Sequence, residues 1–316
     1  MMRTLKFLLS NQLKRSKIVQ PVSGFTLIEL LVAMIISVLV ITPLLGFMIN
    51  ILDTDRREQA KANSEQEIQS ALDYISRDLQ QAIYIYDADG IEAIDDEIFI
   101  PADGVPVLVF WKRELIKDAI PVGAGSDDSF VYSLVAYYLI KDSNRTWSNA
   151  ARIARWQIKD GVARIDGEDG DSCGDDSDDA TQYIICPSGG FAPFDLDGVG
   201  NLAEKMNSWE KGAGDFPASA VLVDFIDQTQ NTVSGVPPVI CPPNTLIPPV
   251  TWSQISPERT GFYACIDRVN TTAQVFLRGN ALARLQSNNL DYTSNNSTYF
   301  PTASIRVQGR SFLFTQ

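Results

Sequence analysis

Acidic side chains crowd one short stretch of this sequence, and their oxygens are suited to binding a hard cation. Between Asp166 and Asp179, eight of the fourteen residues are aspartate or glutamate. Calcium takes six to eight oxygen ligands, so this stretch is a candidate calcium site. The alternative is a solvated acidic loop in which water and salt relieve the repulsion between like charges. The residues alone leave both interpretations open.

A second candidate for calcium is the segment from Asp195 to Asn201, which reads Asp-Leu-Asp-Gly-Val-Gly-Asn. Asp195, Asp197 and Asn201 offer side-chain oxygens at even spacings, as calcium-binding loops do. The segment departs from the EF-hand pattern, because Val199 stands at the fifth position and Met206 at the twelfth. Calcium bound by these three residues is therefore a hypothesis rather than a motif match.

Most hydrolytic chemistry is excluded because the sequence contains no histidine. Nucleophiles activated by imidazole and zinc sites built on imidazole cannot form. Neither a Walker A sequence nor an HExxH pair is present. Paired carboxylates acting on sugars are the one enzymatic alternative. We predict that the protein is not an enzyme and that it needs no cofactor, calcium aside.

Four cysteines lie far beyond the apolar N-terminal segment: Cys173, Cys186, Cys241 and Cys265. An even number of cysteines in an exported region predicts disulfides, with free buried thiols as the alternative. Pairing by sequence neighbourhood would join Cys173 to Cys186 and Cys241 to Cys265. The other two connectivities remain open from sequence.

One carboxylate interrupts an apolar run near the N-terminus. From Phe25 to Ile49 the only ionisable side chain is that of Glu29. As a helix this run is roughly 38 Å long, enough to span a hydrocarbon core of about 30 Å. A secretory signal has a shorter apolar core. A plain anchor leaves Glu29 unexplained, because a carboxylate in the bilayer costs on the order of 3 kcal/mol.

Charge is distributed unevenly around this run. The 24 residues at the N-terminus contain five basic residues and no acidic one, namely Arg3, Lys6, Lys14, Arg15 and Lys17. The remaining chain has 21 basic and 39 acidic residues, a net charge of −18. This asymmetry predicts a single pass through a membrane with a cytoplasmic N-terminus and the head outside. It also disfavours nucleic acid as a partner of the head.

The residues Gly24 to Leu30, which read Gly-Phe-Thr-Leu-Ile-Glu-Leu after a basic leader, resemble the processing motif of type IV pilins and pseudopilins. In that family an inner-membrane prepilin peptidase cleaves after the glycine and methylates the new N-terminal phenylalanine. The resemblance implies cleavage between Gly24 and Phe25 and N-methylation of Phe25. It also implies that Glu29 assists assembly by pairing with the N-terminal ammonium of a neighbouring subunit.

A second resemblance concerns the order of later segments. The order of segments is similar to that of the J-type minor pseudopilins of type II secretion. These segments are Arg56 to Gln81, followed by Val107 to Trp111, Val135 to Leu139 and Ile153 to Trp156. The segments Ile41 to Phe47 and Tyr84 to Asp87 look like those of pseudopilins for hormogonium polysaccharide secretion in filamentous cyanobacteria. These resemblances imply a minor subunit at the tip of a filament and no catalysis.

The elements that position these residues follow from periodicity. Beyond Leu52 the sequence lacks Pro and Gly until Gly90, and a stripe of apolar residues recurs at helical spacing: Ile68, Leu72, Ile75, Leu79 and Ala82 or Ile83. We expect one helix from Phe25 to about Ile83 whose second half docks on a sheet, with a coiled coil as the alternative. Asp73, Arg77 and Asp78 are expected on its other faces.

The head is expected to be β-rich from Ile98 onward. Predicted strands cover 98–100, 105–111, 130–140, 153–158, 220–225 and, with interruptions, 262–276. Gly123 to Gly125, Lys159 to Gly161 and Val236 to Pro249 are expected connections. The fold class is therefore α+β and pilin-like. Its parts are a removable leader (1–24), a transmembrane or filament-core helix (25–52), an amphipathic helix (53–86) and a head with one antiparallel sheet and long loops (87–316).

These expectations favour a minor pseudopilin that initiates or caps a filament and supports export, with polysaccharide as a candidate cargo. Its implied partners are the prepilin peptidase, other pilins or pseudopilins and the inner-membrane assembly platform. The alternative is a glycan-binding adhesin at a pilus tip, with Trp147, Trp209 and Trp252 as candidate contacts. Those tryptophans could equally belong to the core.

Overall fold

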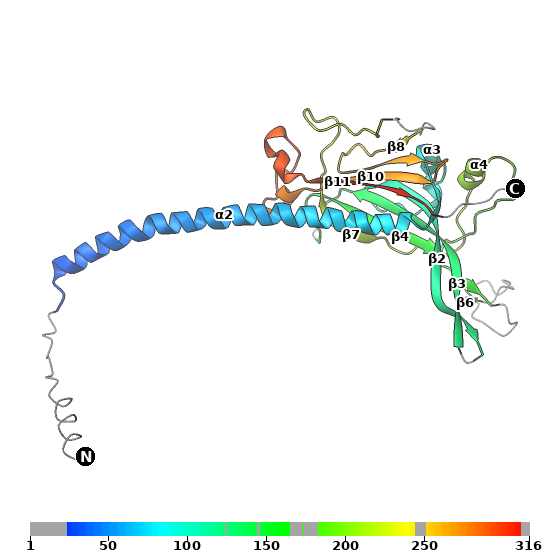
Figure 1. The fold of residues 1–316 in the computed structure, drawn as a ribbon, viewed down its shortest axis with the longest axis horizontal. Helices are drawn as coiled ribbons and strands as arrows, with labels where there is room; N and C mark the ends of the chain where they lie inside the picture. The colour runs from blue at the N-terminus through cyan, green and yellow to red at the C-terminus, as the bar shows by residue number, and fades with distance from the viewer. Residues whose placement is uncertain are drawn as a thin grey trace, which may run out of the picture. The chain divides into compact units, whose positions relative to one another are not determined.

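The computed structural model describes residues 24–123, 125–143, 146–164, 173, 183–243 and 251–310. The chain divides into two compact units, one up to Asp55 and the other from Arg56 onward, and each is described by itself. The predicted fold class is confirmed. A long helix, α2 (Leu27–Leu79), precedes a head built of antiparallel sheets (Figure 1).

The part of α2 in the first unit is apolar and exposed along its whole length. It contains Pro43 and Gly46, yet the helix continues without interruption. By length and composition, α2 is the one helix among the described residues that could cross a membrane. In water its exposed apolar side chains would be strongly unfavourable, so this part requires a lipid or protein environment.

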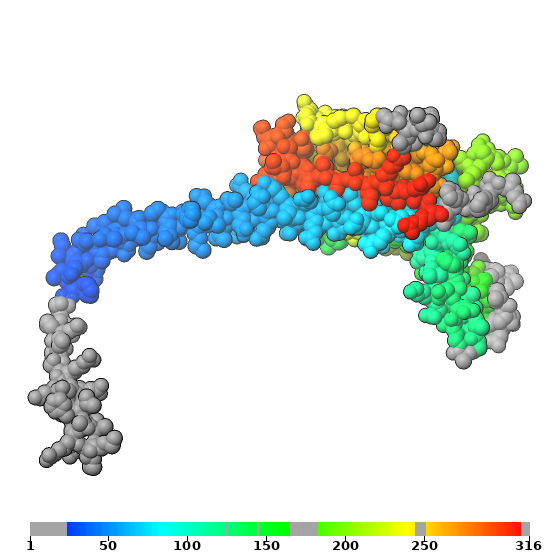
Figure 2. Space-filling view, in the orientation of Figure 1, coloured from blue at the N-terminus to red at the C-terminus, as the bar shows by residue number. Residues whose placement is uncertain are grey.

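The second half of α2 belongs to the head. Its buried side chains form one stripe, namely Ala60, Ser64, Ile68, Ala71, Leu72, Ile75, Ser76, Asp78 and Leu79. The apolar members from Ile68 onward join the main core together with strands of both large sheets. Figure 2 shows this half of the helix beside the C-terminal strand β11 (Thr302–Gln308). The predicted docking on a sheet is confirmed for this half of the helix.

The helix ends earlier than expected. Residues 80–81 form a turn, and Ala82–Ile85 form strand β1, so the helical prediction for 80–86 was wrong. Ala82 to Tyr86 are all buried, and a run of consecutive buried β-branched and aromatic residues suits a strand covered on both faces. Periodicity could not separate the last helical turn from this strand, because Ala82 and Ile83 also continue the helical spacing.

The larger sheet has five antiparallel strands in the order β1-β2-β3-β4-β7. These are β2 (Gly104–Val122), β3 (Gly125–Ile140), β4 (Ala151–Lys159) and β7 (Ala220–Ile226) beside β1. The predictions for 105–111, 130–140, 153–158 and 220–225 are confirmed, although β2 and β3 are longer. The part of β2 after Lys112 pairs with the part of β3 before Ser133, and together they form a two-stranded arm. The arm ends at Gly123, whose φ of +58° suits a tight turn.

The second large sheet has the order β11-β10-β9-β8, so the expected single sheet is replaced by two. Its other strands are β8 (Ser253–Ile255), β9 (Phe262–Asp267) and β10 (Thr272–Arg278). The interrupted strand predicted for 262–276 is the β9–β10 hairpin. Two short strands, β5 (Val162–Ala163) and β6 (Tyr183–Ile185), pair with each other. The predicted strand at 98–100 is absent, because a 3₁₀ turn, η1 (Asp95–Glu97), leads into irregular chain there.

Short helical turns complete the head: α3 (Ala88–Ala93), α4 (Leu202–Asn207), η2 (Ala281–Arg284) and η3 (Ser294–Tyr299). Two disulfides join Cys173 to Cys186 and Cys241 to Cys265, which is the pairing by sequence neighbourhood. In the chain-entropy model each cross-link contributes about 3 to 4 kcal/mol. The second disulfide ties the proline-rich connection to the buried residue Cys265 of β9.

Candidate functional site

The N-terminal motif places the expected cleavage site just outside the helix. Gly24, Phe25 and Thr26 are not helical, and α2 begins at Leu27. Phe25 is 82% exposed, and apart from the chain neighbours of Gly24 no described residue lies within 4 Å of a Cβ placed there. Within the described part of the chain, nothing therefore obstructs the bond between Gly24 and Phe25. Most of the basic leader lies outside the described residues.

Thr26 and Glu29 form a reciprocal cap at the start of α2. The Glu29 amide donates to Thr26 Oγ1 at 3.3 Å, and the Thr26 amide donates to Glu29 Oε2 at 3.4 Å. The Thr26 hydroxyl also donates to Glu29 Oε2, at 3.3 Å. This is a capping box, whose Thr-x-x-Glu signature is visible in the sequence. Our sequence analysis missed it, although that signature was enough to find it.

Glu29 thus has Thr26 as a hydrogen-bonding partner, and it lies in the first turn of α2. A carboxylate in the first turn of a helix is stabilised by the helix dipole. The capping bonds satisfy two backbone amides that no helical carbonyl can reach. Among the described residues only Thr26 donates to its two oxygens, which leaves further acceptor positions for a cation. The arrangement is compatible with an N-terminal ammonium approaching from another chain.

A second carboxylate, Asp78, fixes the other end of α2 to the sheet. Lys112 Nζ donates to Asp78 Oδ1 at 3.0 Å, while Arg155 Nε and the Tyr137 hydroxyl each donate to Oδ2 at 2.7 Å. These partners come from β2, β3 and β4, three neighbouring strands. Asp78 is 7% exposed, so the prediction that it occupies a solvent-facing side of the helix was wrong.

The surroundings of Asp78 keep it ionised. Burial alone would raise its pKa, but hydrogen bonding and charge from Arg155, with further contributions from Lys112 and Tyr137, hold the pKa below its ordinary value. A buried pair of opposite charges satisfied in this way positions the helix. We assign Asp78 a structural role.

The calcium hypothesis gains no geometric support from the described part of the chain. The Asp197 amide donates to Asp195 Oδ1 at 2.8 Å, and Asn201 Oδ1 accepts from the amides of Ala203 and Glu204 to cap α4. One carboxylate oxygen of Asp195 and the side-chain oxygen of Asn201 are thus used by the backbone. Within the described ranges, no group of three acidic, Cys or His side chains is arranged to hold a metal. The acidic residues of the stretch 166–179 lie outside those ranges.

The three tryptophans considered as glycan contacts differ in environment. Trp209 is 4% exposed, and its indole donates to the Ala192 carbonyl at 2.9 Å, so it belongs to the core. Trp147 is 39% exposed, whereas Trp252 is half-buried beneath the Arg306 guanidinium, 5.0 Å from the ring centroid. The structure therefore removes Trp209 from the candidate surface residues.

Comparison with known proteins gives one match. Residues 21–45 match the prokaryotic N-terminal methylation motif, which is of the type IV pilin type. The matched residues include the expected cleavage site, the capping box and much of the apolar part of α2. Neither the curated proteins nor the solved structures contain a significant match to the chain. The motif and the apolar helix together indicate a pilin-type subunit with a single membrane anchor.

Proposed function

We propose that this protein is a structural subunit of a type II secretion-like or type IV pilus-like filament, cleaved after Gly24 and methylated at Phe25. The observation that carries the proposal is the methylation motif at residues 21–45, which lies at the start of an exposed apolar helix. Such a helix is stable in a membrane before assembly and among other subunits afterwards. The same helix can therefore serve as anchor and as filament core.

Processing would act on the non-helical chain before Leu27. Cleavage by a prepilin peptidase would give Phe25 a new amino group, which stays positively charged after methylation. Glu29 would then attract the corresponding group of a neighbouring subunit, since a carboxylate in an apolar environment is stabilised by a cation. Assembly would thereby satisfy two charges that are each unfavourable alone in the membrane.

Within such a filament we place this chain as a minor pseudopilin at the tip. The head, counted from Arg56 to Gln316, is large, and such bulk hinders close repetition along a filament. A single copy that initiates or caps the filament avoids this conflict. The resemblance to J-type and polysaccharide-secretion pseudopilins supports an export role, with the head on the periplasmic side of the inner membrane and assembly-platform proteins as partners.

The first experiment is the mass of the N-terminal peptide from protein isolated from its own cells, combined with a Glu29→Ala variant. We expect the wild-type chain to start at methylated Phe25. We expect the variant to be cleaved but excluded from filaments, with secretion lost. An intact leader in the wild type would overturn the pilin-type proposal.

Glu29→Gln separates charge from capping. Glutamine can complete the same capping box, because Gln is also found at this position of the box. We therefore expect it to keep the start of α2 but to fail in assembly as Glu29→Ala does. If Glu29→Gln assembles normally, Glu29 has no ionic role, and the chain would be a membrane anchor carrying a head.

A further inference from the structure

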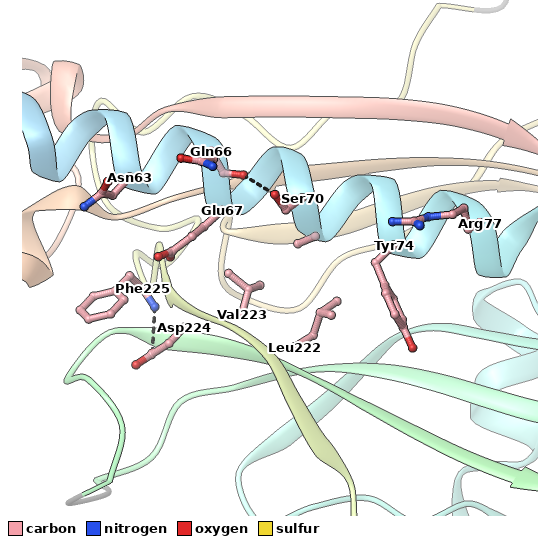
Figure 3. A pocket seen from close by; sticks show the side chains of 11 residues that line it. Asn63, Gln66, Glu67, Ser70, Tyr74, Arg77, Leu222, Val223, Asp224 and Phe225 are labelled. Carbon is pink, nitrogen blue, oxygen red and sulfur yellow. Dashed lines mark hydrogen bonds between the residues drawn. The ribbon is translucent and has the colours of Figure 1, made fainter.

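A groove runs along the second half of α2, between the helix and the edge strand β7. It has a volume of about 600 Å³ and lies wholly within the head. Its lining residues on α2 recur at helical spacing from Asn63 to Arg77, and those on β7 run from Leu222 to Phe225 (Figure 3). At about 1.5 Å per residue, the helical wall is roughly 21 Å long. This volume falls in the range of binding pockets.

The two walls differ in chemistry. The helix contributes mainly polar side chains, those of Asn63, Gln66, Glu67, Ser70, Tyr74 and Arg77. The strand contributes Leu222, Val223 and Phe225, whereas Asp224 is turned away and accepts hydrogen bonds from Ser148. The groove is therefore amphipathic across its width. A ligand that fits it needs one apolar surface and one edge rich in hydrogen-bonding groups.

Several polar groups on the helical wall are available to a ligand. Glu67 pairs with Arg284, and Arg77 Nε donates to the Asp73 carbonyl. By contrast, the side-chain amides of Asn63 and Gln66 and the Tyr74 hydroxyl make no hydrogen bond to any other described residue. Tyr74 is 42% exposed, so part of its ring faces solvent. These groups offer donors, acceptors and an aromatic surface.

The lining argues against ionic ligands. An anionic ligand such as a phosphate would require a cluster of cations, but among the groove residues Arg77 is accompanied by Glu67 and Asp224. A metal ion would require free carboxylates, and both carboxylates already have partners. The ligand that remains is uncharged and amphipathic.

A peptide strand added to β7 is also disfavoured. Phe225 has a φ of +58° and leaves the extended conformation, and the pairing of β7 with β4 is irregular at two places. The Phe225 amide donates to Asp224 Oδ1, and the Phe225 carbonyl accepts from the Asn280 amide. Because β7 bends at Phe225 and the backbone amide and carbonyl of that residue already have partners, a further strand would pair poorly with this edge.

We propose that this groove binds a neutral oligosaccharide. A pyranose ring has apolar C–H faces and a rim of hydroxyls, which matches one apolar wall and one wall of amides and hydroxyls. The ring would pack on Leu222, Val223 and the exposed part of Tyr74, and its hydroxyls would bond to Asn63 and Gln66. The inference goes beyond filament assembly and does not depend on it, because it rests on the head alone.

The test uses the full-length chain in detergent, titrated with cellohexaose, maltohexaose and oligosaccharides released from the source cell's own exopolysaccharide. We expect at least one to bind by calorimetry and to show saturation transfer from Tyr74. Tyr74→Ala should weaken binding about tenfold, and Gln66→Ala should weaken it several-fold. Both positions are exposed, so the head should remain folded.

Gln69→Ala is the matched control, since Gln69 is exposed on the same helix and does not line the groove. It should bind as the wild type does. The proposal is wrong if none of the three sugars binds, or if Tyr74→Ala and Gln66→Ala bind as tightly as Gln69→Ala. Binding of a serine- and threonine-rich hexapeptide in preference to the sugars would also overturn it. Loss of filament assembly would leave these binding results unchanged.

Discussion

At the level of single residues, two carboxylates on α2 occupy opposite environments. Glu29 lies exposed in an apolar segment and bonds mainly within its own first turn. Asp78 is buried and is bonded by three side chains from three strands. Glu29 therefore retains capacity for a partner from outside the chain, whereas the bonding of Asp78 is complete within it. The two residues should respond differently to substitution.

Asp78→Asn should destabilise the head strongly. The change removes the counter-charge of Arg155 and leaves Lys112 with the partly exposed Glu114, 3.5 Å away. Removing one partner of a buried ion pair typically costs about 3 to 5 kcal/mol. Chemical denaturation of the full-length chain in detergent measures this free energy of unfolding. Asp73→Asn is the control, because Asp73 is exposed five residues earlier on the same helix. A loss below about 1 kcal/mol would contradict the role assigned to Asp78.

The same variant should change how stability depends on pH. Asp78 has a lowered pKa in the folded protein, so the unfolded chain binds a proton more readily at this position. Its contribution to stability is therefore present above the ordinary aspartate pKa of 3.8 and is lost as pH falls through the folded value. We expect the stability difference between wild type and Asp78→Asn to narrow below about pH 4. A constant difference down to pH 2 would exclude this linkage.

Thr26 is expected to fix where α2 begins. Thr26→Val keeps the shape of the side chain but removes the capping hydroxyl, at a cost of about 1 kcal/mol. Hydrogen exchange of the first-turn amides should then accelerate roughly fivefold in detergent micelles. Thr26→Ser retains the hydroxyl and should exchange like the wild type. Equal exchange in both variants would show that the cap does not hold this end of the helix.

At the level of elements, the buried stripe on α2 is the main attachment of helix to head. Ile75 is fully buried, so Ile75→Ala should cost about 2 to 5 kcal/mol through lost burial and an unfilled cavity. Gln69→Ala on the exposed side should change stability by less than about 0.5 kcal/mol. Thermal unfolding followed by near-ultraviolet circular dichroism distinguishes the two. Similar melting temperatures would mean that the stripe contributes little.

Elements were predictable from sequence where periodicity and composition agreed. The helical stripe from Ile68 to Leu79 and the apolar strand Phe130 to Ile140 carried clear patterns, and both elements are present. The end of α2 was misplaced, because Ala82 and Ile83 satisfy either pattern. Strand β11 was missed although Thr302–Gln308 alternates polar and apolar residues along its whole length, so its local signal was readable. Its pairing with β10 is a long-range contact that has no such local signal.

At the level of the whole molecule, sequence revealed the motif but not the contacts between distant segments. Asp78 looked solvent-facing because its partners lie 34 to 77 residues away, and the strand register that joins them has no local signature. The groove is equally hidden, since it joins residues near 70 with residues near 223. The processing motif was readable because it is contiguous.

The attachment of α2 also determines how the head would respond to mechanical force. A pull directed along the helix axis would load the buried stripe and the Asp78 ion pairs in shear. Contacts arranged in this way share the load and fail together, whereas contacts that peel apart fail one after another. A filament that pushes or retracts could therefore transmit tension to the head without extracting the helix stepwise. Asp78 lies near the end of α2 farthest from the anchor, so its ion pairs would carry the shared load at the far end of the stripe.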